Sequence, residues 1–207
     1  LVKSRPIATA DNPNQQSVLY KFVKIRHFKF IDDTIPFQKK KNKLVWRGAA
    51  YKQHRIDFLK QFFDKSPLID IAQHNKNGNL NPQWQKPFMS ISEQLQNKFI
   101  LSIEGNDVAT STKWILSSNS LLFMKKPKYE TWFMEGNLAP DIHYVKLKDD
   151  YSDIKEKIEH YIDHPEKAEE IIHNANQWTE QFKDPYIEDW LSFKVLEQYF
   201  QYSNQYT

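Results

Sequence analysis

The sequence predicts a doubly wound α/β domain, in which helices cover both faces of a parallel sheet and a helical arm ends the chain. Short, nearly continuous apolar runs alternate with segments whose apolar residues recur every three or four positions. Such runs are typical of strands buried on both faces, and their alternation with helices is typical of parallel sheets. With 207 residues, 40% of them hydrophobic and only four glycines, the chain can form one well-buried domain or two small ones.

The expected strands are apolar runs bounded by turn-forming residues. KLVW ends at the pair Arg47-Gly48, KFILSIEG ends at Gly105, and SLLFMKK ends before Pro127. We expect strands at 43–46, 67–73, 98–105, 120–126 and 143–147.

The expected helices follow from apolar spacing and from residues that start or end helices. Pro67 ends the segment in which Ile56 and Leu59 share a face, and Ser90 stands three residues before Glu93, as in a capping box. We expect helices at 15–28, 54–65, 90–96, 110–118, 152–164, from 165 onward and at 186–202. The last one carries an apolar stripe of Trp190, Phe193, Leu196 and Phe200.

Composition excludes several kinds of site and partner. The chain has no cysteine, which excludes a disulfide framework, a thiolate zinc site and a cysteine nucleophile. The net charge of +3 is too small to indicate a polyanionic partner by itself, and no run approaches the ~20 apolar residues of a membrane span. A rival interpretation is a nucleic-acid-binding protein that uses the basic region from Lys21 to Arg55 and the many aromatics. The aromatics stand at core-like positions, so we expect no nucleic-acid partner.

The segment GNDVATSTK links the end of an expected strand to the start of a helix. In open α/β sheets ligands bind beyond the carboxyl ends of the strands, where helix starts offer N–H groups to anions. Small residues let a ligand approach the backbone, and hydroxyl groups can donate to a phosphate. The alternative is that a side chain here only caps the helix. The candidate contacts are Gly105, Asp107, Val108, Ala109, Thr110, Ser111 and Lys113.

A second candidate is the segment WRGAAYKQHR. Arg47 leaves the end of a strand, Gly48 gives backbone room, and Arg55 opens the following helix. Two guanidinium groups there can bind a diphosphate in bidentate fashion. The alternative is a pair of ordinary surface arginines. Both candidate segments should lie at the same edge of the sheet.

Further candidates follow Pro127. Glu130 and Glu135 are suited to accepting hydrogen bonds from sugar hydroxyls, and His143 is a base, a hydrogen-bond donor or an ordinary strand residue. The lysine-rich run at 39–43 is expected to be a solvated loop. The sequence shows no zincin, Walker A or dinucleotide fingerprint, so we expect neither a metal nor a cofactor.

The blocks WRG, IEGNDVATSTKW, SNSLLF and ETWFMEGNLAPDIHYVKL together resemble the CAP10-like glycosyltransferases, and among them the bacterial lipopolysaccharide core enzymes of the LpsA kind. The resemblance implies a GT-B enzyme with two Rossmann-like halves that transfers a hexose from a UDP-sugar to a lipopolysaccharide core acceptor, inverting and without a metal. It also implies a cytoplasmic location, with peripheral contact at the inner membrane. Residues 1–185 would form the Rossmann-like, nucleotide-sugar-binding C-terminal half, and 186–207 a helix that docks on the N-terminal half.

The resemblance assigns donor contacts to Arg47, Arg55, residues 108–113, Glu130 and the HY block of His143. Eukaryotic relatives carry arginine where this chain has Lys113. The catalytic base of the family is an aspartate farther upstream of the WRG block than this chain extends, and Asp11, Asp32 and Asp33 do not match it. The alternative is therefore a non-catalytic fragment that binds a nucleotide-sugar but lacks the half with the base.

Overall fold

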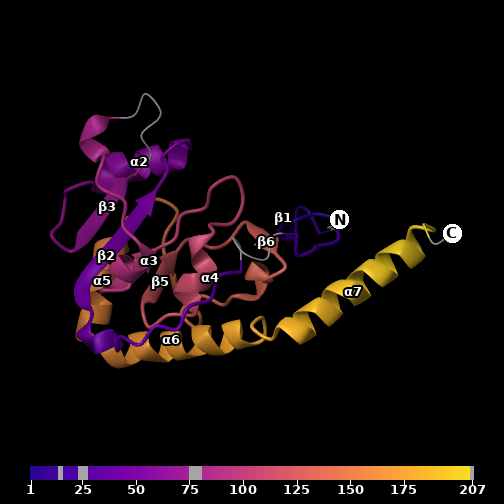
Figure 1. The fold of residues 1–207 in the computed structure, drawn as a ribbon. Coiled ribbons are helices and arrows are strands. Elements are labelled where there is room, and N and C mark those ends of the chain that lie inside the picture. The colour runs from indigo at the N-terminus through magenta and orange to yellow at the C-terminus, as the bar shows by residue number, and fades with distance from the viewer. Residues whose placement is uncertain (14–15, 23–27, 75–80, 206–207) are drawn as a thin grey trace.

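A parallel sheet forms the centre of the computed structural model, which describes residues 1–13, 16–22, 28–74 and 81–205 (Figure 1). Its five strands lie in the order β3-β2-β4-β5-β7, and every neighbouring pair is parallel. The strands are β2 (Lys41–Gly48), β3 (Ile69–Gln73), β4 (Asn97–Leu101), β5 (Leu121–Met124) and β7 (Val145–Lys146). These are the five strands that the sequence predicts.

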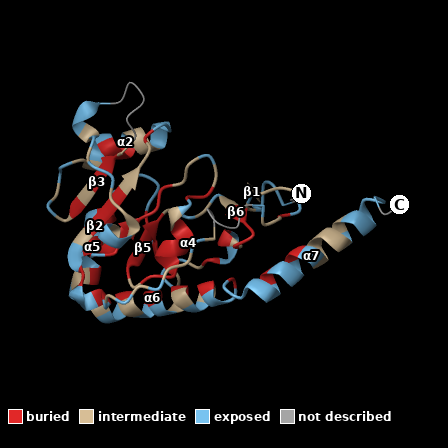
Figure 2. Ribbon diagram, in the orientation of Figure 1, coloured by how far each residue is buried: buried red, intermediate tan, exposed pale blue. Residues whose placement is uncertain are grey.

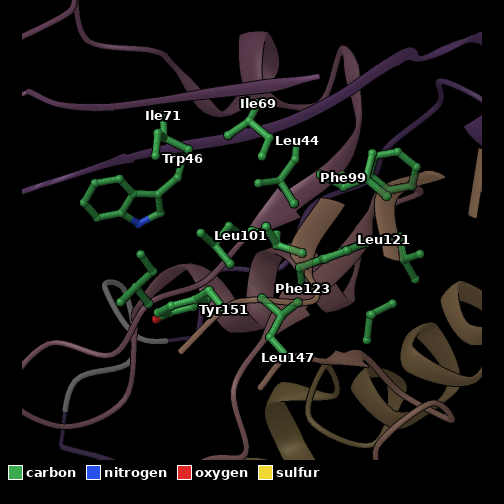
Figure 3. Close-up of a cluster of buried hydrophobic side chains, with 14 of the residues drawn as sticks. Leu44, Trp46, Ile69, Ile71, Phe99, Leu101, Leu121, Phe123, Leu147 and Tyr151 are labelled. Carbon is green, nitrogen blue, oxygen red and sulfur yellow. The ribbon is translucent and has the colours of Figure 1, made fainter. Parts of the chain in front are cut away.

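Helices cover both faces of the sheet, as predicted. Leu44 and Trp46 of β2 pack with Phe58 in one apolar cluster, whereas Val45 between them packs with Trp114 in a second cluster on the opposite face. This alternation explains the apolar runs, because each strand buries both of its faces. Figure 3 shows the first cluster. The helices are α2 (Gln53–Phe62), α3 (Ile91–Gln94), α4 (Ser111–Leu116), α5 (Ile154–Asp163), α6 (Pro165–Glu180) and α7 (Pro185–Tyr202).

The helix α3 begins with the predicted capping box. The Ser90 N–H donates to the Glu93 carboxylate at 2.6 Å, and the Glu93 N–H donates to the Ser90 hydroxyl at 3.2 Å. Two backbone groups that the helix leaves unpaired are thereby satisfied.

The helix expected at 15–28 is wrong for the residues of this segment that the structure describes, 16–22 and 28, and residues 14–15 and 23–27 lie outside the described part. Leu19 is buried in extended chain, and the Tyr20 N–H donates to the Val2 carbonyl at 2.9 Å. The N-terminal segment continues into β1 (Ser4–Pro6), which pairs antiparallel with β6 (Tyr129–Thr131). Pairing with the distant N-terminus thus overrides the helical spacing.

The run at 39–43 is expected to be a solvated loop; Lys39, Lys41 and Asn42 are exposed, but the loop assignment and the solvation of Lys40 are wrong. The side chain of Lys40 is fully buried, and its ammonium lies 2.7 Å from the Asp33 carboxylate. Burial lowers the pKa of Lys40, with Asp33 opposing that shift. Strand β2 begins at Lys41, so the lysines lie at the start of the sheet.

Helix α7 extends away from the rest of the domain (Figure 1) and is largely exposed (Figure 2). Its first turn is anchored by Glu188, whose carboxylate accepts from Lys21 at 2.6 Å and from the Trp132 indole at 2.9 Å. Trp190 and Phe193 of the predicted stripe are 58% and 59% exposed. Among the helices in the described ranges, none has the length and apolarity of a membrane span.

Candidate functional site

A cavity of about 360 Å³ lies at the carboxyl end of β4, with walls from the segments that follow β2, β4 and β5. Strand β3 lies on one side of β2 and β4 on the other, so the chain reverses its direction of sheet building between β2 and β4. Open α/β sheets bind ligands at such a switch point. The walls of the cavity are residues 102–109 after β4, residues 124–129 from the end of β5 onward, Lys52 and His54 near the start of α2, Thr112, Glu135 and Tyr151.

Six residues that the sequence singles out line this cavity: Gly105, Asp107, Val108, Ala109, Thr112 and Glu135. The Asp107 carboxylate accepts from the Ser4 hydroxyl and from the Lys3 ammonium, both at 2.8 Å. The N-terminal segment therefore holds the loop after β4 in place. A Cβ on Gly105 would lie 3.5 Å from Arg55, an ordinary contact, so close packing does not require glycine there.

The two predicted arginines lie at the same edge of the sheet but outside the described cavity wall. Arg55 donates to the carbonyls of Ala49, Ile103 and Glu104 at 2.9, 2.6 and 3.0 Å, so it ties the chain after β2 to the chain after β4. Burial lowers its pKa. The Arg47 guanidinium donates to the Asp70 carboxylate at 2.9 Å and is 5% exposed. Contact of either group with a diphosphate stays a prediction, and in this structure both have protein partners.

Lys113 is fully buried and is not part of the cavity wall as described. Its ammonium lies 2.7 Å from the Glu135 carboxylate and 5.1 Å from the centre of the Phe133 ring. Glu135 also accepts from the Thr131 N–H at 2.6 Å. The pair is therefore a buried ion pair within the fold, and a phosphate contact by Lys113 stays a prediction.

Thr110 and Ser111 stand at the start of α4 but are not among the described lining residues. Thr110 is the N-cap residue and its side chain makes no capping hydrogen bond. The Ser111 hydroxyl lies 3.3 Å from the hydroxyl of Ser102, which lines the cavity. The structure thus does not support the alternative of a Thr110 cap.

Gly48 and Glu130 have visible packing roles. A Cβ on Gly48 would lie 2.4 Å from the indole of Trp46, so only glycine fits beside that ring. The Glu130 carboxylate accepts from the Arg5 guanidinium at 2.8 Å and packs against Gly136. Neither residue is part of the described cavity wall.

His143 lies apart from the cavity wall as described. Its Nδ1 accepts from the Ala139 N–H at 2.9 Å, and its ring packs against Trp178 in a tilted arrangement with the centroids 5.6 Å apart. Burial lowers the pKa of His143. A ring that accepts at Nδ1 is neutral with its proton on Nε2, which fits a structural residue.

Sequence reasoning missed the charged groups that dominate the cavity. Four lysines line it: Lys52, Lys125, Lys126 and Lys128. Within the described ranges none of the four forms an ion pair, whereas Asp107 and Glu135 of the same wall are paired with Lys3 and Lys113. The cavity is therefore positively charged. The KKPK run at the end of a predicted strand was the available signal.

Glu104 is the remaining carboxylate of the wall. Its Oε1 accepts from the Lys128 N–H at 3.0 Å. Burial raises the pKa of Glu104, and the Lys128 N–H partly opposes that rise. Among the residues that the structure describes, no group of three His, Cys, Asp or Glu side chains is placed to hold a metal ion.

Open parallel α/β domains bind ligands at such a switch point, and the positive charge of this cavity suits an anionic ligand. The chain belongs to glycosyl transferase family 90, whose model matches residues 23–205. This confirms the CAP10-like resemblance.

Several relatives accompany the family match. O-glucosyltransferase LpsA of Dichelobacter nodosus is 48% identical over 199 residues, which cover 96% of this chain and 61% of that protein. Protein O-glucosyltransferase 2 of Danio rerio is 27% identical over 147 residues, covering 69% of this chain and 29% of that protein. The chain thus spans less than two thirds of the length of these relatives.

Among solved structures, the fold is similar to the C-terminal domain of a glycosyl transferase group 1 family protein (LpcC) from Francisella tularensis. The TM-score is 0.42 and the identity 13%, and the match covers 79% of this chain and 95% of that one.

Proposed function

We propose that this chain binds the UDP-sugar donor of a glycosyl transfer and that the sugar is glucose. The observation that carries the proposal is the cavity at the switch point, whose four lysines have no ion-pair partner in the described part of the chain. Membership of family 90 supports a sugar-nucleotide ligand. The names of the relatives, O-glucosyltransferase in the bacterial and the vertebrate protein, support glucose.

The proposed transfer is inverting and independent of a metal. A leaving UDP carries its negative charge on the diphosphate, and fixed positive charges near it stabilise the transition state. In this proposal the lysines of the cavity supply that charge, so a divalent ion is not needed. The acceptor hydroxyl needs a general base. Asp33 is not suited to that task, because its side chain is 2% exposed and accepts from Lys40 and from the Asn119 N–H.

The proposed acceptor is a lipopolysaccharide core, in keeping with the name LpsA of the bacterial relative. Such an acceptor would be met at the cytoplasmic face of the inner membrane, where we place the protein. We further propose a GT-B arrangement, in which the exposed stripe of α7 docks on an N-terminal half. The non-catalytic alternative shares the donor site and differs only in lacking transfer.

Isothermal titration calorimetry of the chain with UDP and UDP-glucose, in EDTA and then in Mg²⁺ or Mn²⁺, tests the donor site. The proposal expects saturable binding of both ligands, of similar affinity in EDTA and in metal. Absence of binding under all conditions overturns the donor proposal. Binding that appears only with a divalent ion overturns the metal-independent part.

A further inference from the structure

Tyr151 has an unusual position at the floor of the cavity. It lies between β7 and α5 in left-handed backbone, with φ of 60°, a conformation that a residue with a bulky side chain rarely adopts. Its ring packs on Phe58 with the centroids 4.7 Å apart, and the residue is 5% exposed. Figure 3 shows the hydroxyl pointing away from Phe123 and Leu147. Surrounding structure must hold such a backbone in place, and positions of this kind gather at functional sites.

Lys125 lies directly on this ring. Its ammonium is 3.9 Å from the centroid of Tyr151, well within the ~6 Å at which a cation is attracted to an aromatic face. Both residues line the cavity. Burial lowers the pKa of Lys125, as expected for an ammonium group partly withdrawn from water. The ring thus fixes the position of a positive charge in the cavity wall.

The other cations near the cavity differ from Lys125 in one of two ways. Arg55 and Lys113 are already bonded, the first to backbone carbonyls and the second to Glu135. Lys52, Lys126 and Lys128 are exposed, so each must lose side-chain entropy when it binds a ligand. Lys125 alone among these described cations lines the cavity, is partly buried and lacks an anionic partner within ion-pair distance.

We propose that Lys125 contacts the diphosphate of the nucleotide-sugar and that Tyr151 is the positioning residue that holds its ammonium in place. This inference rests on the proposed donor function. The Lys125 ammonium lies on the face of the Tyr151 ring, and both residues are part of the cavity wall. The arginines expected from the sequence are bound to other protein groups. Preorganisation by the ring lowers the entropic cost of the contact.

The test measures the affinity of the full chain for UDP, inorganic pyrophosphate and uridine in EDTA. Lys125→Gln is expected to weaken UDP and pyrophosphate about 10- to 100-fold, the size of a lost charge-assisted hydrogen bond, and to leave uridine unchanged. Lys125→Arg keeps the charge and should stay within about threefold of the wild type. Lys146→Gln, an exposed lysine of β7 that the cavity wall as described does not include, is the matched control and should change nothing.

Two variants of Tyr151 separate positioning from simple folding. Tyr151→Phe keeps the ring and should bind UDP within about threefold of the wild type. Tyr151→Leu removes the aromatic face and should weaken UDP about 2- to 30-fold without changing uridine, an effect that general loosening of the fold would not confine to the diphosphate. If Tyr151→Leu does not fold, Lys125→Gln and Lys125→Arg decide the matter.

The outcomes separate this inference from the proposed function. If the wild type binds no UDP, the donor function itself fails. If the wild type binds UDP and Lys125→Gln binds it equally well, only the role of Lys125 is overturned. Equal weakening of UDP and uridine in Lys125→Gln also overturns it, because the contact would then not be with the diphosphate.

Discussion

Replacing Lys113 by Met should unfold the domain at much lower temperature without acting on ligand binding directly. The side chains of Lys113 and Glu135 are 0% and 2% exposed and lie 2.7 Å apart. Removing one partner of a buried pair leaves the other charge uncompensated, which costs about 3–5 kcal/mol. For a domain of this size each kcal/mol lowers the melting temperature by about 2–4 °C, so the expected drop is about 6–20 °C.

Thermal melts followed by circular dichroism measure this drop. Lys155→Met is the control, because Lys155 and Glu159 form an exposed pair at 3.7 Å, which should contribute about 0–1 kcal/mol. Adding Glu135→Gln to Lys113→Met should restore part of the stability, since it removes the uncompensated charge and keeps acceptance from Thr131. A Lys113→Met variant that melts like the wild type but loses UDP affinity would refute the buried-pair account and favour the phosphate contact.

Three further changes have definite expectations. Gly48→Ala should destabilise the domain by about 1–3 kcal/mol in urea unfolding, because the new Cβ would lie 2.4 Å from Trp46; an unchanged midpoint would show that the indole can shift. Arg47→Ala should lower the melting temperature, because it strips a buried partner from Asp70; loss of UDP affinity with no change in melting would favour a ligand contact instead. Burial raises the pKa of Glu104, so the folded state holds the proton of this carboxyl more tightly than the unfolded state. The contribution of that proton to folding stability is complete below the unfolded pKa of about 4.3 and is lost as the pH rises through the folded pKa. Glu104→Gln should therefore be more stable than the wild type at pH 7 and equal to it near pH 4, and the opposite order in melts at the two pH values would contradict this.

The sheet could be predicted because its signal is local. Leu121 and Phe123 face one apolar cluster and Leu122 the other. Strand β5 is therefore a continuous apolar run, which can be recognised from a few neighbouring residues alone. The segment around Leu19 has apolar residues near helical spacing, but its structure depends on pairing with Val2, which lies outside that local pattern. The local pattern there favours a helix, but the pairing with Val2 gives extended chain.

The candidate site could be located from the sequence, but the partners of its side chains could not be predicted. The strand ends and Gly105 place it at the edge of the sheet where the cavity lies. Whether a cation near that edge can contact a ligand depends on whether another protein group already binds it. Lys113 pairs with Glu135, 22 positions away, and Arg55 donates to a carbonyl 48 positions away. Such pairings exist only in the folded chain. Lys125 was missed because a lysine after a strand looks like ordinary solvated surface until Tyr151 is seen beneath it.

The central claim is that the cavity at the switch point binds the donor nucleotide, and a two-dimensional amide NMR titration of the chain with UDP in EDTA tests it most directly. The account predicts saturable shifts concentrated in residues 102–109 and 124–129 and at Tyr151, the segments that form the cavity wall. Shifts confined to residues remote from these segments, such as the apolar groove beside α7 that Val18, Trp178 and Leu191 line, would contradict it. So would a complete absence of shifts at saturating UDP.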